Sequence, residues 1–156
     1  MMAERWRDVA DDVAGAIRHF RAAVALFRGG EHDVATSNGY RDVMAFQHAM
    51  QSGYTSFELA LRRILALLDE PLPQGPDWHA VLLRRLSRAS EGDRPALLRR
   101  DLATAADELL RFRHVAMHSY DHFDERKAAI AVEAAEVFLR HVEADIATFR
   151  AIIDPD

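Results

Sequence analysis

Hydrophobic residues recur at spacings of three and four positions along most of the chain. This spacing matches the 3.6-residue period of an α-helix, in which such positions share one face. It predicts long amphipathic helices over residues 4–28, about 40–69 and about 124–152. No segment alternates between apolar and polar residues for long enough to indicate a β-strand. The chain is therefore predicted to be all-α.

Helix-breaking residues mark where the first two helices end. Gly29 and Gly30 end the first helix, and a loop is expected through Asn38 and Gly39. A proline-rich segment at residues 71–76 ends the second helix, because proline lacks the backbone N–H that a helix interior needs.

The second half of the chain begins with a short element. Asp77 is placed to cap a short helix over residues 78–86. Arg94 and Pro95 are expected to open a further long helix, since proline fits the first helical turn. The predicted fold is a bundle of four long helices plus a short helix, forming a single domain over residues 1–156.

Composition narrows the class of protein. The chain has 156 residues and is 49% hydrophobic, which is enough to bury a core. It has no cysteine, which excludes disulfides, thiolate zinc sites and cysteine nucleophiles. No apolar run approaches the roughly 20 residues that span a bilayer, and the first residues lack an apolar signal core. We expect a cytoplasmic protein that does not bind membranes.

Charge is unevenly distributed. The net charge of −5 argues against non-specific coating of nucleic acid, because that binding depends on neutralising phosphates. Residues 84–113 nevertheless hold eight arginines and five acids, whereas residues 114–156 hold four basic residues and nine acids. A local basic face and a set of arginines paired with acids are both compatible with this distribution.

The densest group of reactive side chains lies in residues 113–120, which read Arg-His-Val-Ala-Met-His-Ser-Tyr. In an ideal helix Arg113 and His118 point about 140° apart, so they share one face only if the helix ends or distorts there. The turn-forming residues that follow indicate that the helix gives way to a loop between residues 118 and 123.

Two interpretations of this segment follow from the residues alone. His114, His118 and His122 are spaced by four, and together with His48 they are similar to the three-histidine metal site of DinB-like bundles. In that reading His48, His114 and His118 hold the metal. In a purely structural reading, the histidines cap backbone carbonyls and Arg113 pairs with a nearby acid of its own helix, Asp107 or Glu108.

The order of three residues also matches a known motif. Arg113, His118 and Tyr120 fit the Arg-x4-His-x-Tyr motif of the HepT-like toxins, a branch of the HEPN superfamily. His114 fits the polar residue that often follows the arginine in these motifs. The motif lies late in an all-helical chain and precedes a final amphipathic helix, as in that family.

Two further segments look like those of HepT-like proteins. They are residues 51–58, Gln-Ser-Gly-Tyr-Thr-Ser-Phe-Glu, and residues 76–79, Pro-Asp-Trp-His. The resemblance therefore spans about residues 40–152, and it implies a single HEPN-like helical domain.

The resemblance implies an activity. HepT-like proteins are toxins of two-gene toxin–antitoxin modules, and act as homodimeric endoribonucleases whose motifs meet in a cleft. RNA carries its own nucleophile, the 2′-hydroxyl, so cleavage requires no metal and no cofactor. By resemblance, His118 would serve as general base or acid, and Arg113 would bind the scissile phosphate. His114 and Glu108 would support these two catalytic residues.

The resemblance also implies a partner. Tyr120 would accept AMP from a nucleotidyltransferase antitoxin of the MNT type, and the added negative charge would repel RNA. An alternative is a non-catalytic HEPN protein that only binds such a nucleotidyltransferase. The low overall charge favours this alternative.

Overall fold

A computed structural model of the chain describes residues 2–90, 94–118 and 122–155. These residues form five helices and no extended strand: α1 (Met2–Gly29), α2 (Ser37–Leu67), α3 (Trp78–Leu86), α4 (Arg100–His118) and α5 (Glu125–Ile153). The prediction of an all-α bundle with four long helices and one short helix is confirmed.

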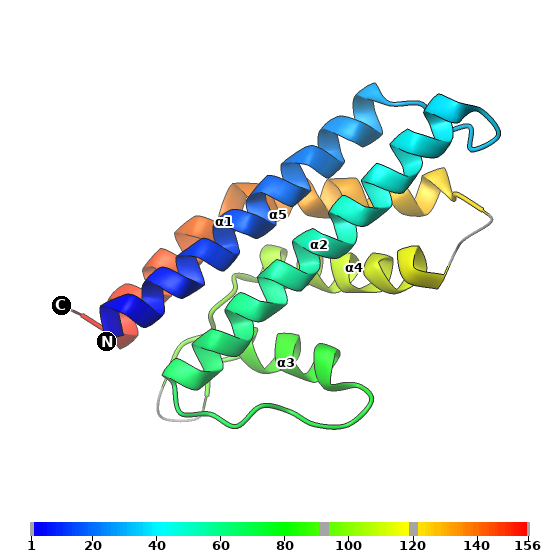
Figure 1. The fold of residues 1–156 in the computed structure, drawn as a ribbon. Helices are drawn as coiled ribbons and strands as arrows, with labels where there is room; N and C mark the ends of the chain where they lie inside the picture. Colours follow the sequence, from blue (N-terminus) through cyan, green and yellow to red (C-terminus); the bar gives the residue numbers. More distant parts are fainter. Residues whose placement is uncertain (1, 91–93, 119–121, 156) are drawn as a thin grey trace.

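The long helices pack as two layers (Figure 1). α1 and α2 lie side by side as an antiparallel pair, and α4 and α5 form the second pair behind them. α5 also packs on α1, and α4 packs on α2. The short α3 packs on α2 and α4 at one end of the bundle.

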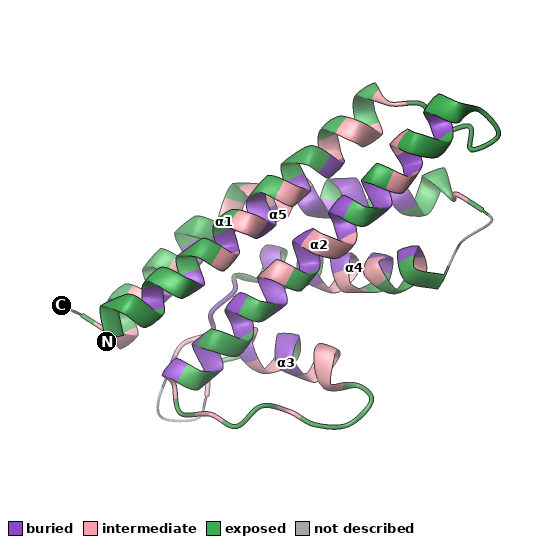
Figure 2. Ribbon diagram, viewed as in Figure 1, coloured by how far each residue is buried: buried purple, intermediate pink, exposed green. Residues whose placement is uncertain are grey.

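Aromatic side chains join three of the helices in the core. The ring of Phe138 on α5 contacts Phe20 on α1 and Phe57 on α2, each at a centroid distance of 4.9 Å. All three side chains are fully buried, and their rings meet edge-on, a favourable aromatic geometry. The buried faces of the helices turn inward and the exposed faces outward, as their 3.6-residue spacing requires (Figure 2).

Side-chain caps set two of the helix starts. The Thr36 side chain accepts a hydrogen bond from the backbone N–H of Gly39, so α2 begins at Ser37. The expected loop through Asn38 and Gly39 is therefore wrong. Asp124 caps α5 by accepting hydrogen bonds from two backbone N–H groups, which confirms the predicted start of the last helix.

The predicted start of α4 at Arg94 and Pro95 is also wrong, because tertiary contacts hold this segment out of a helix. Arg94 is buried and its Nε lies 2.5 Å from a carboxylate oxygen of Glu70. The N–H of Leu97 donates to the carbonyl of Leu86 instead of joining a helical turn. α4 begins only at Arg100. The residue before it, Arg99, donates its backbone N–H to the carboxylate of Asp145 on α5.

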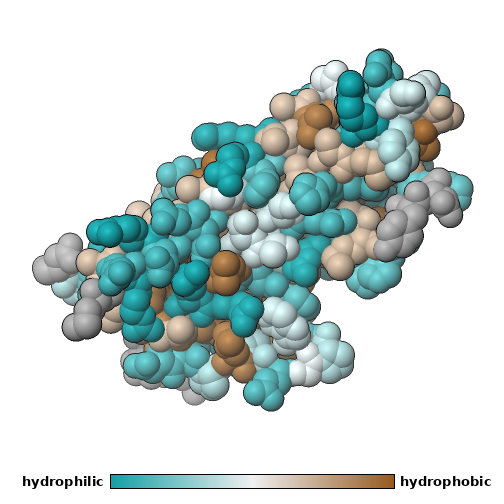
Figure 3. All heavy atoms as spheres, in the orientation of Figure 1, coloured by the Kyte–Doolittle hydropathy of each residue, from teal (hydrophilic) through white to brown (hydrophobic). Residues whose placement is uncertain are grey.

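The short α3 begins where predicted, at Trp78, but Asp77 makes no side-chain capping bond. None of the helices in the described ranges combines the length and hydropathy needed to cross a bilayer. On the face shown in Figure 3, hydrophilic side chains predominate and hydrophobic ones are scattered among them.

A glycine allows the close approach of α1 and α2. A Cβ atom at Gly53 would lie 2.9 Å from the buried ring of Phe20, whereas one at Gly15 would meet nothing closer than 3.6 Å. We expect Gly53→Ala to lower the free energy of unfolding by about 1–2 kcal/mol, because the displaced ring outweighs the helix propensity of alanine. Urea unfolding of the purified protein measures this.

Gly15→Ala is the matched control. It places the same substitution in a helix of the same bundle without a clash. It should therefore raise the free energy of unfolding by up to about 1 kcal/mol. Equal effects of the two substitutions would show that α1 and α2 do not approach as closely as described.

Candidate functional site

Arg113 lies on the face of α4 that packs against α2. Its Nη1 is 3.4 Å from Oε1 of Glu58, and the arginine side chain is 17% exposed. The guanidinium carbon lies 5.6 Å from the ring centroid of Tyr54, one turn before Glu58 on α2. One edge of the guanidinium is thus held by α2 while part of the group still reaches solvent.

Glu58 connects this arginine to a third helix. Its carboxylate is buried, with Oε1 facing Arg113 and Oε2 accepting a hydrogen bond of 2.6 Å from Nδ1 of His79 on α3. The His79 ring stacks on that of Trp78 at a centroid distance of 3.8 Å. The buried carboxylate therefore has a partner for each oxygen, as buried charges require.

His118 is the last residue of α4 and is exposed. Its Nδ1 lies 2.8 Å from the backbone carbonyl of His114. A carbonyl can only accept, so Nδ1 carries the hydrogen, and in the neutral ring Nε2 then carries the lone pair. The rings of His114 and His118 lie 4.3 Å apart, which leaves both imidazoles on one side of the helix end.

The end of α4 at His118 agrees with the predicted change from helix to loop. Tyr120, the predicted acceptor of AMP, lies outside the described residues. Its role stays a prediction that rests on its place in the motif.

The acids of α4 do not hold Arg113. Asp107 and Glu108 both pair with Arg111, at 2.7 and 2.9 Å, because these residues are three and four positions apart on the exposed face of one helix. The expectation that Glu108 or Asp107 anchors Arg113 is therefore wrong. The anchor is Glu58, from α2.

The histidines do not form the metal site of the DinB-like reading. Among the described residues, no three histidine or acidic side chains are close enough together to hold a metal ion. His122 follows the end of α4 and does not continue its stripe. His48 instead lies beside Ser52 and near His19 of α1, where burial, with the charges of Arg18 and His48, lowers the pKa of His19.

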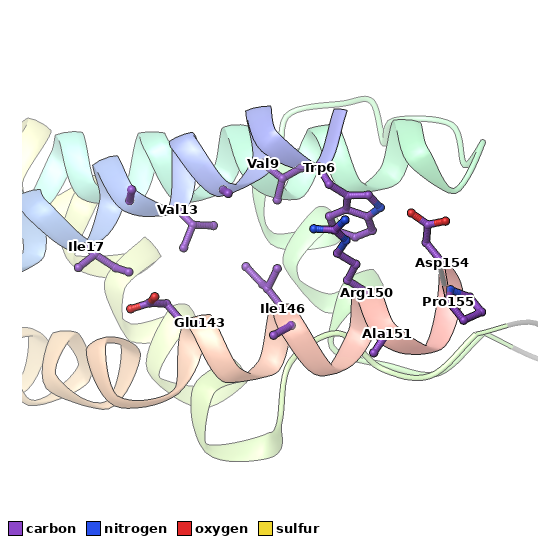
Figure 4. A pocket seen from close by; sticks show the side chains of 13 residues that line it. Trp6, Val9, Val13, Ile17, Glu143, Ile146, Arg150, Ala151, Asp154 and Pro155 are labelled. Atoms are coloured by element: carbon purple, nitrogen blue, oxygen red, sulfur yellow. The ribbon is translucent and has the colours of Figure 1, made fainter. Parts of the chain in front are cut away.

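Three hollows of the described structure lie away from these residues. A groove of about 470 Å³ runs between α1 and α5, lined by Val13, Ile146 and the stacked pair Trp6 and Arg150 (Figure 4). A hollow of about 460 Å³ lies beside Glu70 and Arg94, and one of about 340 Å³ lies between α3 and α4. None of the three is lined by Arg113 or His118.

Sequence reasoning did not identify Glu58 and His79, although a signal was present. Glu58 is an acid within the apolar stripe of α2, between Tyr54 and Leu61 at helical spacing. An acid in such a stripe needs a buried partner. The two segments that resemble HepT-like proteins, residues 51–58 and 76–79, end at Glu58 and His79. These two residues hydrogen-bond to each other, and Glu58 also contacts Arg113.

Comparison with known proteins shows the family. A family model described as HepT-like protein matches residues 45–153, which covers α3, α4, α5 and most of α2. Comparison with curated proteins and with solved structures gave no match.

Tyr54 offers a test of the polar cluster. It is fully buried, and its hydroxyl has no hydrogen-bond partner among the described protein groups. Burial raises the pKa of Tyr54, and the negative charge of Glu58 raises it further. We expect Tyr54→Phe to increase the free energy of unfolding by about 1 kcal/mol at neutral pH, since it removes an unsatisfied buried hydroxyl.

The same substitution should change the dependence on pH. Below the ordinary tyrosine pKa of about 10, both folded and unfolded chains keep the proton. Above it the unfolded chain ionises first, so the wild type should lose stability relative to Tyr54→Phe as pH rises. Urea unfolding at several pH values measures this, with the exposed Tyr40→Phe as control. A parallel pH dependence of wild type and Tyr54→Phe would contradict the burial of the hydroxyl.

Proposed function

The chain belongs to the HepT-like family, and from this we propose that it is the ribonuclease toxin of a two-gene toxin–antitoxin module. The observation that carries the proposal is the placement of His118. The ring is exposed at the end of α4 and its Nδ1–H donates to the His114 carbonyl, so in the neutral ring Nε2 is the nitrogen left to accept a proton.

The proposed reaction uses groups that RNA and this chain supply. Nε2 of His118 takes the proton of the 2′-hydroxyl, whose oxygen attacks the adjacent phosphorus and displaces the 5′-oxygen of the next nucleotide. Arg113 binds the phosphate and stabilises the added negative charge of the transition state. Its contact with Glu58 uses one Nη1 atom, so the remaining N–H groups can meet a phosphate.

The leaving oxygen must gain a proton, which calls for a second acid. One chain provides a single Arg113 and His118 pair, so we place the reaction in a homodimer whose two motifs share one cleft. The partner copy's histidine then serves as the acid. No step of this reaction needs a metal ion.

The proposed partner is a nucleotidyltransferase antitoxin of the MNT type, acting in the cytoplasm. Tyr120 follows His118 by two positions, so AMP on its hydroxyl would bring a phosphodiester close to the scissile phosphate. Repulsion between the two negative charges and the bulk of AMP would block RNA.

Two observations favour a second candidate, a non-catalytic HEPN protein that binds the nucleotidyltransferase. The buried carboxylate of Glu58 offsets part of the charge of Arg113, and the chain as a whole carries a net charge of −5. Both features weaken the attraction of the surface for RNA.

Removal of the motif side chains separates these candidates. We expect His118→Ala and Arg113→Ala each to reduce the rate of RNA cleavage by at least about a hundredfold, as loss of an acid–base group or a charge-stabilising group does. Cleavage of single-stranded RNA by purified protein measures this, and the wild-type rate should be unchanged in EDTA.

Two exposed residues provide matched controls. Arg111→Ala removes an arginine of the same helix, and His48→Ala removes an exposed histidine of α2. Both should cleave as the wild type does. Inert wild-type protein would favour the binding protein, and loss of cleavage in EDTA would contradict the metal-free reaction.

The proposed nucleotidyltransferase partner can be tested by whether it adds AMP to Tyr120. Incubation of the chain with an MNT-type nucleotidyltransferase and ATP should add AMP and abolish cleavage. Mass spectrometry should find the modification lost in Tyr120→Phe and kept in Tyr40→Phe, which alters an exposed tyrosine of α2. AMP on a different residue would refute the assignment of Tyr120.

A further inference from the structure

We propose that Glu58 is a positioning residue for Arg113, and that His79 in turn fixes Glu58. The inference rests on the proposed function, since it concerns the arginine assigned there to the phosphate. It links three helices: the carboxylate on α2 holds the guanidinium on α4 and is held by the imidazole on α3.

Burial makes Glu58 a firm anchor. Its side chain is 7% exposed, and each carboxylate oxygen has its own partner, at 3.4 Å for Arg113 and 2.6 Å for His79. A buried carboxylate with two partners cannot turn away without leaving a charge unpaired, which is strongly unfavourable. The position of Arg113 is thereby tied to the rigid body of the bundle.

The neighbouring Arg111 shows the contrast. It is 67% exposed, and it pairs with two partly exposed acids of its own helix. Such surface pairs exchange with water and hold a side chain weakly. Of these two arginines, Arg113 is the one that takes its acid from another helix and rests on an aromatic ring, that of Tyr54.

Contacts at the start of α3 hold His79 in place. His79 stacks on Trp78, and the guanidinium carbon of Arg62 lies 5.6 Å from the Trp78 ring centroid. These contacts fix the imidazole whose Nδ1 donates to Glu58. The proline-rich segment and α3 thus serve to bring one hydrogen-bond donor to the carboxylate.

Positioning and charge neutralisation by Glu58 have opposite kinetic signatures. If Glu58 only offsets positive charge, Glu58→Gln should strengthen RNA binding and lower KM with kcat unchanged. If it positions Arg113, the same substitution loosens a group that acts in the transition state. It should then lower kcat by about ten- to a hundredfold with little change in KM.

The test is the rate of RNA cleavage by Glu58→Gln, His79→Ala and the double variant. We expect a fall in kcat for both single variants, and no further fall in the double variant, because both act through one contact. Additive losses, or a lower KM with unchanged kcat, would overturn the proposal.

Asp145→Asn is the matched control for stability. Asp145, on α5, is a buried carboxylate that also pairs with an arginine: it accepts the backbone N–H and the Nε–H of Arg99, just before α4 begins. If its kcat falls as far as that of Glu58→Gln at equal loss of stability, the effect is one of folding and the proposal fails.

A second readout does not depend on cleavage. The Nη1–H resonances of Arg113 in ¹⁵N spectra should be resolved in the wild type and in Asp145→Asn, and should move to the position of a free arginine in Glu58→Gln. If the wild type fails to cleave RNA and Glu58→Gln still moves the resonance, the proposed function is refuted, whereas the anchoring of Arg113 by Glu58 is retained. An unchanged resonance would refute the anchor itself.

Discussion

The contact of Phe138 with both Phe20 and Phe57 holds α5 against α1 and α2, and the other features of the bundle follow from it. The ring of Phe57 contacts α5, and the residue after it lies about 100° further round α2, on the side where α3 and α4 pack. That residue is Glu58, and it is buried too. A carboxylate enclosed in this way must be paired, and its partners come from α3 and α4. Aromatic packing in the core therefore determines where a charged group can hold Arg113.

The helical period predicted most of the fold. Stripes of apolar residues identified α1, α2 and α5 to within a few residues, because these helices bury one continuous face. The start of α4 was missed for a physical reason. Arg94 and Pro95 have the local character of a first turn, yet Glu70, distant in sequence, binds the arginine in a segment that is not helical. Tertiary contacts can override local helix preference.

The candidate site was predictable only in part. The motif predicted Arg113 and His118 as site residues, and the family comparison shows the HepT-like family without testing these two residues. Spacing along one helix cannot reveal a partner from another helix, so the acids of α4 were the natural expectation for Arg113. They pair with Arg111 because they lie on its exposed face. Glu58 required knowledge of how α2 and α4 pack.

The two ends of the chain lie close together at one end of the bundle, where α1 and α5 run side by side (Figure 1). The helices most distant in sequence are therefore neighbours in space, and their pairing is the contact of longest range in the fold. During synthesis α1 and α2 can form their hairpin early, while the exposed flank of α1 must wait for α5, which is made after the other four helices described. Phe138 belongs to α5, so the aromatic core closes only after that helix has been made.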